Sequence, residues 1–170
     1  MNLRLIKTIL LGSLFALGLA LSGCHNAPET SIDKIDSLKK QVQTDAKTLS
    51  DLETKDFGTL KKDFMTCDSL LQYQEEEQVE KSFETLQLVQ AYLEQFKDTK
   101  PMMQAEIDST LLQLDRLKAD AESHYLSDSL VEVYINTETE YVNRLSNQVQ
   151  YFQDRFGNCQ KDLDAMKMQR

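Results

Sequence analysis

The chain divides into one uninterrupted apolar run near its start and a long remainder in which apolar and polar residues alternate. No residue from Thr8 to Leu21 is charged, and two basic residues, Arg4 and Lys7, precede this run. The run is shorter than the roughly 20 apolar residues that a comfortable membrane span needs. A basic start followed by a short apolar segment predicts a secretory signal peptide.

Apolar residues after position 30 recur at steps of three and four, a spacing that predicts amphipathic α-helices. Four segments show this spacing, over residues 35–52, 83–96, 103–121 and 141–166. The last segment is the clearest, because its apolar residues follow one another at steps of 4, 4, 3, 4, 3, 4 and 3. No later stretch is apolar enough to span a membrane.

Glycine and proline predict two of the interruptions between these helices. The first helix can end at residues 56–59 or at residues 65–68, and Gly58 favours the earlier position because glycine often follows a helix end. Pro101 suits the first turn of a helix better than its interior. We therefore expect a helix boundary just before Pro101.

The segment 123–129 is polar and predicts a turn before the last helix. Residues 137–140 resemble a capping box, which allows the last helix to restart there. The pattern alone therefore leaves the number of long helices at three or four.

Glycine and proline are scarce after residue 23, where the chain holds only Gly58, Gly157, Pro28 and Pro101. Strands need tight turns, and tight turns use these two residue types. The chain is instead rich in helix formers such as Leu, Gln, Glu and Lys. We therefore expect an all-α fold, with residues 31–170 forming an elongated antiparallel bundle of three or four long helices with coiled-coil-like packing.

The charge balance narrows the range of partners. The first 23 residues hold two basic residues and no acidic ones, so the rest of the chain has 17 basic and 28 acidic residues. A surface this acidic repels the phosphates of nucleic acids, which argues against nucleic acid as a partner. It also repels anionic lipid headgroups, so no basic patch is expected to hold the protein at a membrane.

The apolar run ends in Leu21-Ser22-Gly23-Cys24, which resembles the lipobox of bacterial lipoproteins. In that family the cysteine sulfur receives a diacylglycerol, the chain is cut just before the cysteine, and the new N-terminus is usually acylated. The resemblance implies that residues 1–23 are a signal peptide, that cleavage falls between Gly23 and Cys24, and that residues 24–30 form a lipidated tether. The alternative is an ordinary signal peptide or N-terminal anchor in which the cysteine stands by chance.

Two or more acyl chains anchor a protein stably, because each buried methylene contributes about 0.8 kcal/mol. The resemblance therefore implies a cell-envelope protein that is attached to a membrane through the lipid on Cys24 and does not cross it. In some lipoproteins an Asp after the cysteine retains the protein at the inner membrane. His25 stands there instead, which favours the outer membrane and leaves open whether the protein faces the periplasm or the surface.

Cys67 and Cys159 are a candidate disulfide, because two thiols outside the cytoplasm usually bond. The expected order of helices argues against the bond. It places the two residues at opposite ends of parallel helices, about 40 Å apart, whereas a disulfide needs roughly 5.5 Å between Cα atoms. Buried small residues on the apolar seam and an intermolecular bond are the alternatives.

Few residues suggest catalysis or metal binding. The histidines His25 and His124 lie far apart in the sequence, and no His or Cys spacing typical of a metal site occurs. No nucleophile elbow or glycine-rich phosphate loop is present. Residues 75–77 with Glu80 form an acidic cluster, which we interpret as a solvated helix face rather than a calcium site. We therefore expect no cofactor, no metal and no enzymatic activity.

These observations favour a non-catalytic interaction or scaffolding module whose partner is an envelope protein or the cell wall. The chain resembles, in outline only, helical lipoproteins described as cell-wall-binding. The alternative is a lipoprotein that binds a small molecule or an ion between its helices. Because tyrosine is enriched at interfaces, six residues are candidates to line a binding surface: Tyr73, Tyr92, Tyr125, Tyr134, Tyr141 and Tyr151.

Overall fold

The structure is a computed structural model that describes residues 30–73 and 75–168. The expected signal peptide, the cleavage site, the lipidation site Cys24 and the tether to residue 29 all lie outside the described residues. The described part belongs to one helical unit that begins at Ser31. The account below concerns this unit alone.

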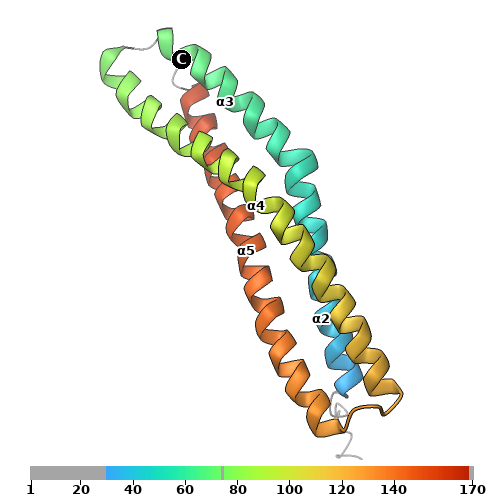
Figure 1. Ribbon diagram of the computed structural model, residues 1–170. Coiled ribbons are helices and arrows are strands. Elements are labelled where there is room, and N and C mark those ends of the chain that lie inside the picture. Colours follow the sequence, from blue (N-terminus) through green and yellow to red (C-terminus); the bar gives the residue numbers. More distant parts are fainter. Residues whose placement is uncertain (1–29, 74, 169–170) are drawn as a thin grey trace, which may run out of the picture. The chain divides into compact units, whose positions relative to one another are not determined.

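The helical unit consists of three long helices and contains no strand in its described residues, which confirms the all-α prediction (Figure 1). Its elements in chain order are α2 (Ser31–Asp51), the π-helix η1 (Leu52–Phe57), α3 (Gly58–Leu70), the 3₁₀-helix η2 (Leu71–Tyr73), α4 (Glu76–Glu122) and α5 (Asp128–Met168). The first four follow one another without interruption. We call this continuous segment, residues 31–73, the first helix.

Ion pairs between the helices establish their directions. α4 runs antiparallel to the first helix, because Asp36 bonds to Lys118 whereas Glu53 bonds to Lys100. α5 runs parallel to the first helix. Lys34, near the start of the first helix, bonds to Glu132, and the matching contact between the other ends of these two helices is described below. Figure 1 shows the three helices side by side.

Each helix buries one apolar stripe, and the repeat of that stripe is close to seven residues. On α5, for example, Val142, Val149 and Phe156 are all buried at this spacing. A repeat of this length keeps one face of a helix turned towards its neighbours over many turns. The predicted coiled-coil-like packing follows from this repeat.

The first helix breaks neither at residues 56–59 nor at residues 65–68, so both predicted ends are wrong. Gly58 has helical dihedral angles, φ −64° and ψ −40°, and does not act as a helix stop. The buried residues explain why the backbone widens here into a π-helix. Val42 and Leu49 are seven residues apart, but Leu52 and Leu60 are eight apart. The wider turn absorbs one extra residue and keeps Leu60 facing the core.

The other predicted interruptions can also be judged. Pro101 lies inside α4 rather than at its start, so the boundary predicted there is wrong. Its ring is exposed, and the core continues across it from Phe96 to Met103, again seven residues apart. Figure 1 shows that α4 bends near its middle, as a helix does at proline. Because Pro101 faces solvent, the hydrogen bond that it cannot donate is lost where water can replace it.

Among the described residues, the helices are interrupted at Glu75 and at residues 123–127. The second of these confirms the polar turn predicted from the sequence. His124 adopts a positive φ of 53°, and the Tyr125 amide donates back to the carbonyl of Asp120 at 3.0 Å. The restart predicted at residues 137–140 is wrong, because α5 begins at Asp128 and continues through them. The described residues therefore form three long helices rather than four.

An aromatic cluster occupies the middle of the bundle, at the level of the π-helix. Phe96 and Phe156 stand edge to face with ring centroids 5.1 Å apart, and Tyr92 meets Phe156 at 5.3 Å. Phe57 and Phe152 complete the cluster. Aromatic pairs of this geometry contribute about 0.5–1.5 kcal/mol each beyond their buried area. The cluster joins all three helices.

Removing a ring from this cluster should therefore destabilise the whole bundle. We expect Phe156→Ala to lower the free energy of unfolding by about 3–5 kcal/mol, because the cavity adds to the lost burial. Phe83→Ala is the matched control, since the Phe83 side chain is 51% exposed, and it should cost about 1 kcal/mol or less. Urea unfolding followed by circular dichroism measures both values. Similar losses for both variants would contradict a central role for the cluster.

The extra residue in the π-helix leads to a second prediction. Deleting Thr54, one of the exposed residues of η1, should convert the wide turn to a regular α-helix and leave the core pairing intact. Deleting Thr44, which is exposed within regular α2, should instead rotate part of the first helix by about 100° and turn its apolar stripe away from the core. We expect the urea midpoint to stay unchanged or rise for the Thr54 deletion and to fall sharply for the Thr44 deletion. Equal losses would show that η1 does not absorb an extra residue.

Candidate interaction surface between α4 and α5

The two cysteines lie near the same end of the bundle, so the separation expected from the sequence is wrong. The Cys67 Sγ atom is 3.5 Å from the carbonyl oxygen of Leu163, and Cys159 lies one helical turn before Leu163. The error came from the boundary predicted at Pro101, which divided α4 into two helices and so reversed the expected direction of the last helix relative to the first. Because α4 is one helix, α5 runs parallel to the first helix and carries Cys159 to the end where Cys67 lies.

The structure does not join Cys67 to Cys159, and both side chains are buried. Burial also raises the pKa of the Cys159 thiol, an effect that the nearby Arg155 partly opposes. A thiol with a raised pKa is less reactive, because the thiolate is the nucleophile. This environment gives Cys159 no sign of a catalytic role.

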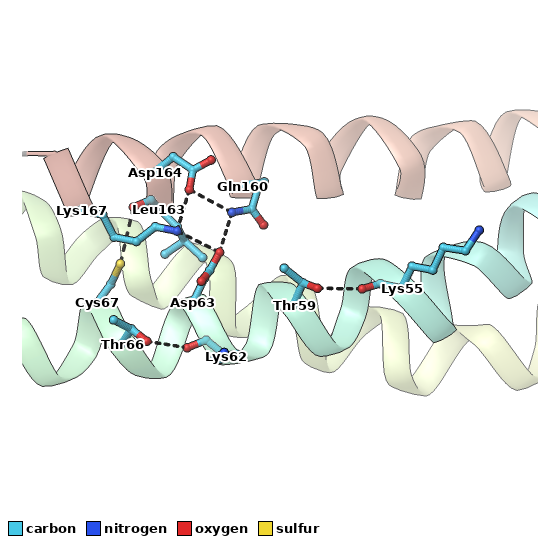
Figure 2. Close-up of polar contacts among 10 residues, drawn as sticks. All are labelled: Lys55, Thr59, Lys62, Asp63, Thr66, Cys67, Gln160, Leu163, Asp164 and Lys167. Atoms are coloured by element: carbon cyan, nitrogen blue, oxygen red, sulfur yellow. Dashed lines mark hydrogen bonds and ion pairs between the residues drawn. The ribbon is translucent and has the colours of Figure 1, made fainter.

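A polar network closes the bundle at the same end (Figure 2). Asp63 of α3 accepts hydrogen bonds from Gln160 Nε2 at 2.7 Å and Lys167 Nζ at 2.9 Å. Lys167 also bonds to Asp164 at 2.7 Å. The hydrogen bond from Gln160 and the contact with Lys167 hold the pKa of Asp63 below its usual value. The network therefore fixes the first helix against α5.

Acid should weaken this network. Because the pKa of Asp63 is lowered in the folded protein, the stabilisation from its ionised form is present above the unfolded value of 3.8 and is lost as the pH falls through the lower folded value. We expect the urea midpoint to fall as the pH is lowered below about 4, and Asp63→Asn to make this fall shallower. Asp68→Asn, an exposed change on the same helix, is the control. An equally steep fall in Asp63→Asn would rule out this contribution.

Ion pairs also tie the first helix to α4. Lys118 Nζ bonds to both carboxylate oxygens of Asp36 at 2.7 Å, and Lys39 pairs with Asp115. Lys100 bonds to Glu53 at 2.8 Å, near the π-helix. These contacts lie at the edge of the seam, where they cover the apolar stripe beneath them.

Polar contacts tie the first helix to α5 as well. Gln41 Nε2 donates to Ser146 Oγ at 2.9 Å, and Ser146 donates in turn to Asp45 at 2.5 Å. Lys34 bonds to Glu132 at 3.1 Å. Together with the network around Asp63, these contacts are spread along most of this seam.

The seam between α4 and α5 is different. No ion pair crosses it within the part of the chain that the structure describes. Its cross-helix hydrogen bond runs from the Tyr92 hydroxyl to the Phe152 carbonyl at 2.7 Å and is buried. Burial raises the pKa of Tyr92, so this hydroxyl stays protonated and donates. The solvent-facing edge of this seam therefore carries no ion pair between the two helices among the described residues.

Three open grooves follow this seam, with volumes of about 710, 680 and 300 Å³. Each is lined by residues of both helices. We call the surface that they form, which follows α5 from Glu138 to Met166 and the facing side of α4, the α4–α5 face.

The middle groove combines aromatic and amide side chains. The ring of Tyr151 is 45% exposed beside the buried Phe152. Four amide side chains line the same groove and make no hydrogen bond within the described residues: Gln95, Asn143, Asn147 and Gln148. Tyrosine and amides with unused hydrogen-bonding groups are suited to contact a polar or mixed partner surface.

Two arginines on the face lie over aromatic rings. The Arg144 guanidinium is 4.8 Å from the ring centroid of Tyr141, and that of Arg155 is 5.6 Å from the ring centroid of Tyr92. Arginine and tyrosine are the residue types that most often dominate binding energy at interfaces. Tyr141 is also 47% exposed, so part of its ring remains accessible.

Two charged side chains on this face each contain one buried polar atom that has no hydrogen-bond partner among the described residues. These atoms are Oε2 of Glu138 and Nε of Arg155. Burial raises the pKa of Glu138. A buried polar atom without a partner costs free energy, so such atoms usually have a structural or functional explanation.

The tyrosines predicted as a binding surface separate into distinct groups. Tyr92 is buried in the core, while Tyr73 and Tyr125 are exposed near the turns. Tyr141 and Tyr151 lie on the α4–α5 face. Tyr134 is exposed near the start of α5 and lines none of the grooves of this face. Sequence reasoning did not find Glu138 and Arg155. A signal was present for Glu138, because it occupies a step-of-three position in the apolar stripe after the buried Ile135.

The structure describes the side chains of Glu75 and Glu80 from the acidic cluster, and that of the second histidine. Glu75 precedes α4 with extended dihedral angles, and its side chain makes no capping hydrogen bond. His124 is exposed in the turn between α4 and α5. Among the described residues, no three His, Cys, Asp or Glu side chains lie where they could hold a metal ion together.

Comparison with known proteins finds no matching family, no similar curated protein and no similar solved structure. Within residues 30–73 and 75–168, no helix has the length and apolar character that crossing a membrane requires. Any statement about function therefore depends on the sequence and on the geometry of the α4–α5 face.

Proposed function

We propose that the protein is a lipid-anchored, non-catalytic interaction module of the bacterial envelope and that the α4–α5 face is its binding surface. One observation carries the proposal of the face: ion pairs cross the other two seams, whereas this seam has none among the described residues, and its middle groove is lined by aromatic and amide side chains. A groove of about 400 Å³ also lies between the first helix and α5, but Phe156 is its one aromatic lining residue. The partner is an envelope protein or the cell wall.

The anchoring part of the proposal depends on Leu21-Ser22-Gly23-Cys24 and on its resemblance to a lipobox. An acylated Cys24 attaches the helical unit to a membrane, more favourably the outer one because His25 follows the cysteine. The acidic composition fits this arrangement, since the lipid and not the protein surface makes the contact with the membrane.

The alternative function, binding of a small molecule or an ion, receives less support. The middle groove has a volume of about 680 Å³, which falls within the range of ligand pockets. Ligand pockets enclose most of the ligand surface, however, and this groove lies open along the seam. An elongated surface suits a macromolecular partner better.

The anchor can be tested by fractionation. We expect Cys24→Ser to abolish lipidation, so that the protein accumulates unprocessed or appears in the soluble fraction instead of the membrane fraction. Cys159→Ala is the control, because it also removes a thiol but leaves the lipobox intact. Metabolic labelling with a fatty acid and membrane fractionation give the readout. Unchanged membrane attachment and labelling in Cys24→Ser would refute the anchor.

The binding surface can be tested in intact cells with a photo-crosslinking residue. We expect one at Tyr151 to give a discrete cross-linked product, because this position faces the middle groove. The same residue at Met65, which is 61% exposed on α3, is the control and should give none. Equal products at both positions, or none at Tyr151, would contradict the proposed surface.

A further inference from the structure

Glu138 and Arg155 carry opposite charges on one helix, and neither has an ion-pair partner among the described residues. Both lie on the side of α5 that faces α4. Glu138 lines a groove with Thr110, and Arg155 lies over the ring of Tyr92. They are 17 residues apart in one continuous helix, or about 25 Å. They therefore cannot pair within one chain.

The point midway between these two residues falls between Ser146 and Asn147. The middle groove of the α4–α5 face, which extends along α5 from Glu140 to Phe152, is centred close to this point. A second copy laid antiparallel on this face, with a twofold axis through the point, brings Glu138 of each copy level with Arg155 of the other. A twofold axis makes the contact self-complementary, as in most homodimers.

The middle of the face suits contact with its own copy. The amide of Asn147 lies near the axis and carries both a donor and an acceptor, so two such amides can bond to each other. Tyr141 and Tyr151 stand on either side of the axis at similar distances along α5. Each exposed ring therefore comes near the other tyrosine of the second copy.

Charge also favours this face over the rest of the surface. The chain has a net charge of −9, so two copies repel each other over most orientations. The middle groove holds one acidic and one basic residue, Glu140 and Arg144, which balance. Like-charge repulsion between two copies is therefore small at the middle groove.

We propose that two copies of this chain associate antiparallel through the α4–α5 face, with Glu138 of each copy paired with Arg155 of the other. This inference depends on the proposed binding surface and names its occupant. It is compatible with two lipid anchors in one leaflet. When the twofold axis stands along the membrane normal, the two helix starts at Ser31 lie at equal height.

Charge reversal in the full-length, membrane-attached protein tests the pairing. We expect Glu138→Arg and Arg155→Glu each to reduce self-association at least tenfold, because each places like charges opposite one another. The double variant should restore it. Co-expression of the two single variants with different tags should restore it too, since each then supplies the charge that the other lacks. Co-purification of the two tags after mild detergent extraction measures the association.

Independent controls separate lost pairing from lost folding. Circular dichroism should show wild-type helicity and melting for each variant. Asn147→Arg, which places two like charges near the axis, should also abolish self-association, whereas Gln153→Arg, on the side of α5 that faces the first helix, should not. These two variants decide the case if charge reversal at Glu138 or Arg155 prevents folding.

The outcomes distinguish this inference from the proposed function. If wild-type copies fail to co-purify, or if each single variant associates as the wild type does, the antiparallel dimer is refuted. If they fail to co-purify while photo-crosslinking from Tyr151 yields a product of a mass other than the dimer's, the face binds a different partner. The proposed function then stands and the dimer does not.

Discussion

Buried apolar residues recur about every seven positions on all three helices, and the rest of the structure depends on keeping this repeat in register. Where the repeat meets one extra residue, between Leu52 and Leu60, the backbone widens into a π-helix and the packing continues. Where it meets Pro101, the helix bends with the proline on its exposed side. The aromatic cluster around Phe96 and Phe156 lies between these two irregularities and joins all three helices there.

The three seams between the helices differ in the polar contacts that cross them. The seams of the first helix are covered by charged pairs and hydrogen bonds such as Lys118 with Asp36 and Asp63 with Lys167. In the α4–α5 seam the contacts between the helices, such as the Tyr92–Phe152 hydrogen bond, are buried. No ion pair among the described residues covers them at the surface. Open grooves, exposed tyrosines and unsatisfied charges on one surface indicate a face that is completed by another molecule. We therefore propose that the protein binds its partner where its own polar contacts between helices are fewest.

The fold could largely be predicted from the sequence, because helical spacing and the scarcity of glycine and proline are properties of the chain alone. The helix ends could not. Gly58 and Pro101 are local signals for a break, and tertiary packing overrides both, since Leu60 and Met103 are buried immediately after them. The candidate face depended on which seam lacks paired charges, and charged residues occur throughout the sequence. Only Glu138, a charge in an apolar stripe, marked it in advance.

Hydroxyl-radical footprinting of the protein in intact envelopes, read by mass spectrometry, tests the central claim most directly. The account predicts that Tyr141 and Tyr151 are protected there and become reactive in the dilute, detergent-solubilised protein. Tyr73 and Tyr125 are 79% and 80% exposed near the turns and should react equally in both states. If Tyr141 and Tyr151 react in the envelope as readily as Tyr73 and Tyr125 do, the α4–α5 face is uncovered and the account is wrong.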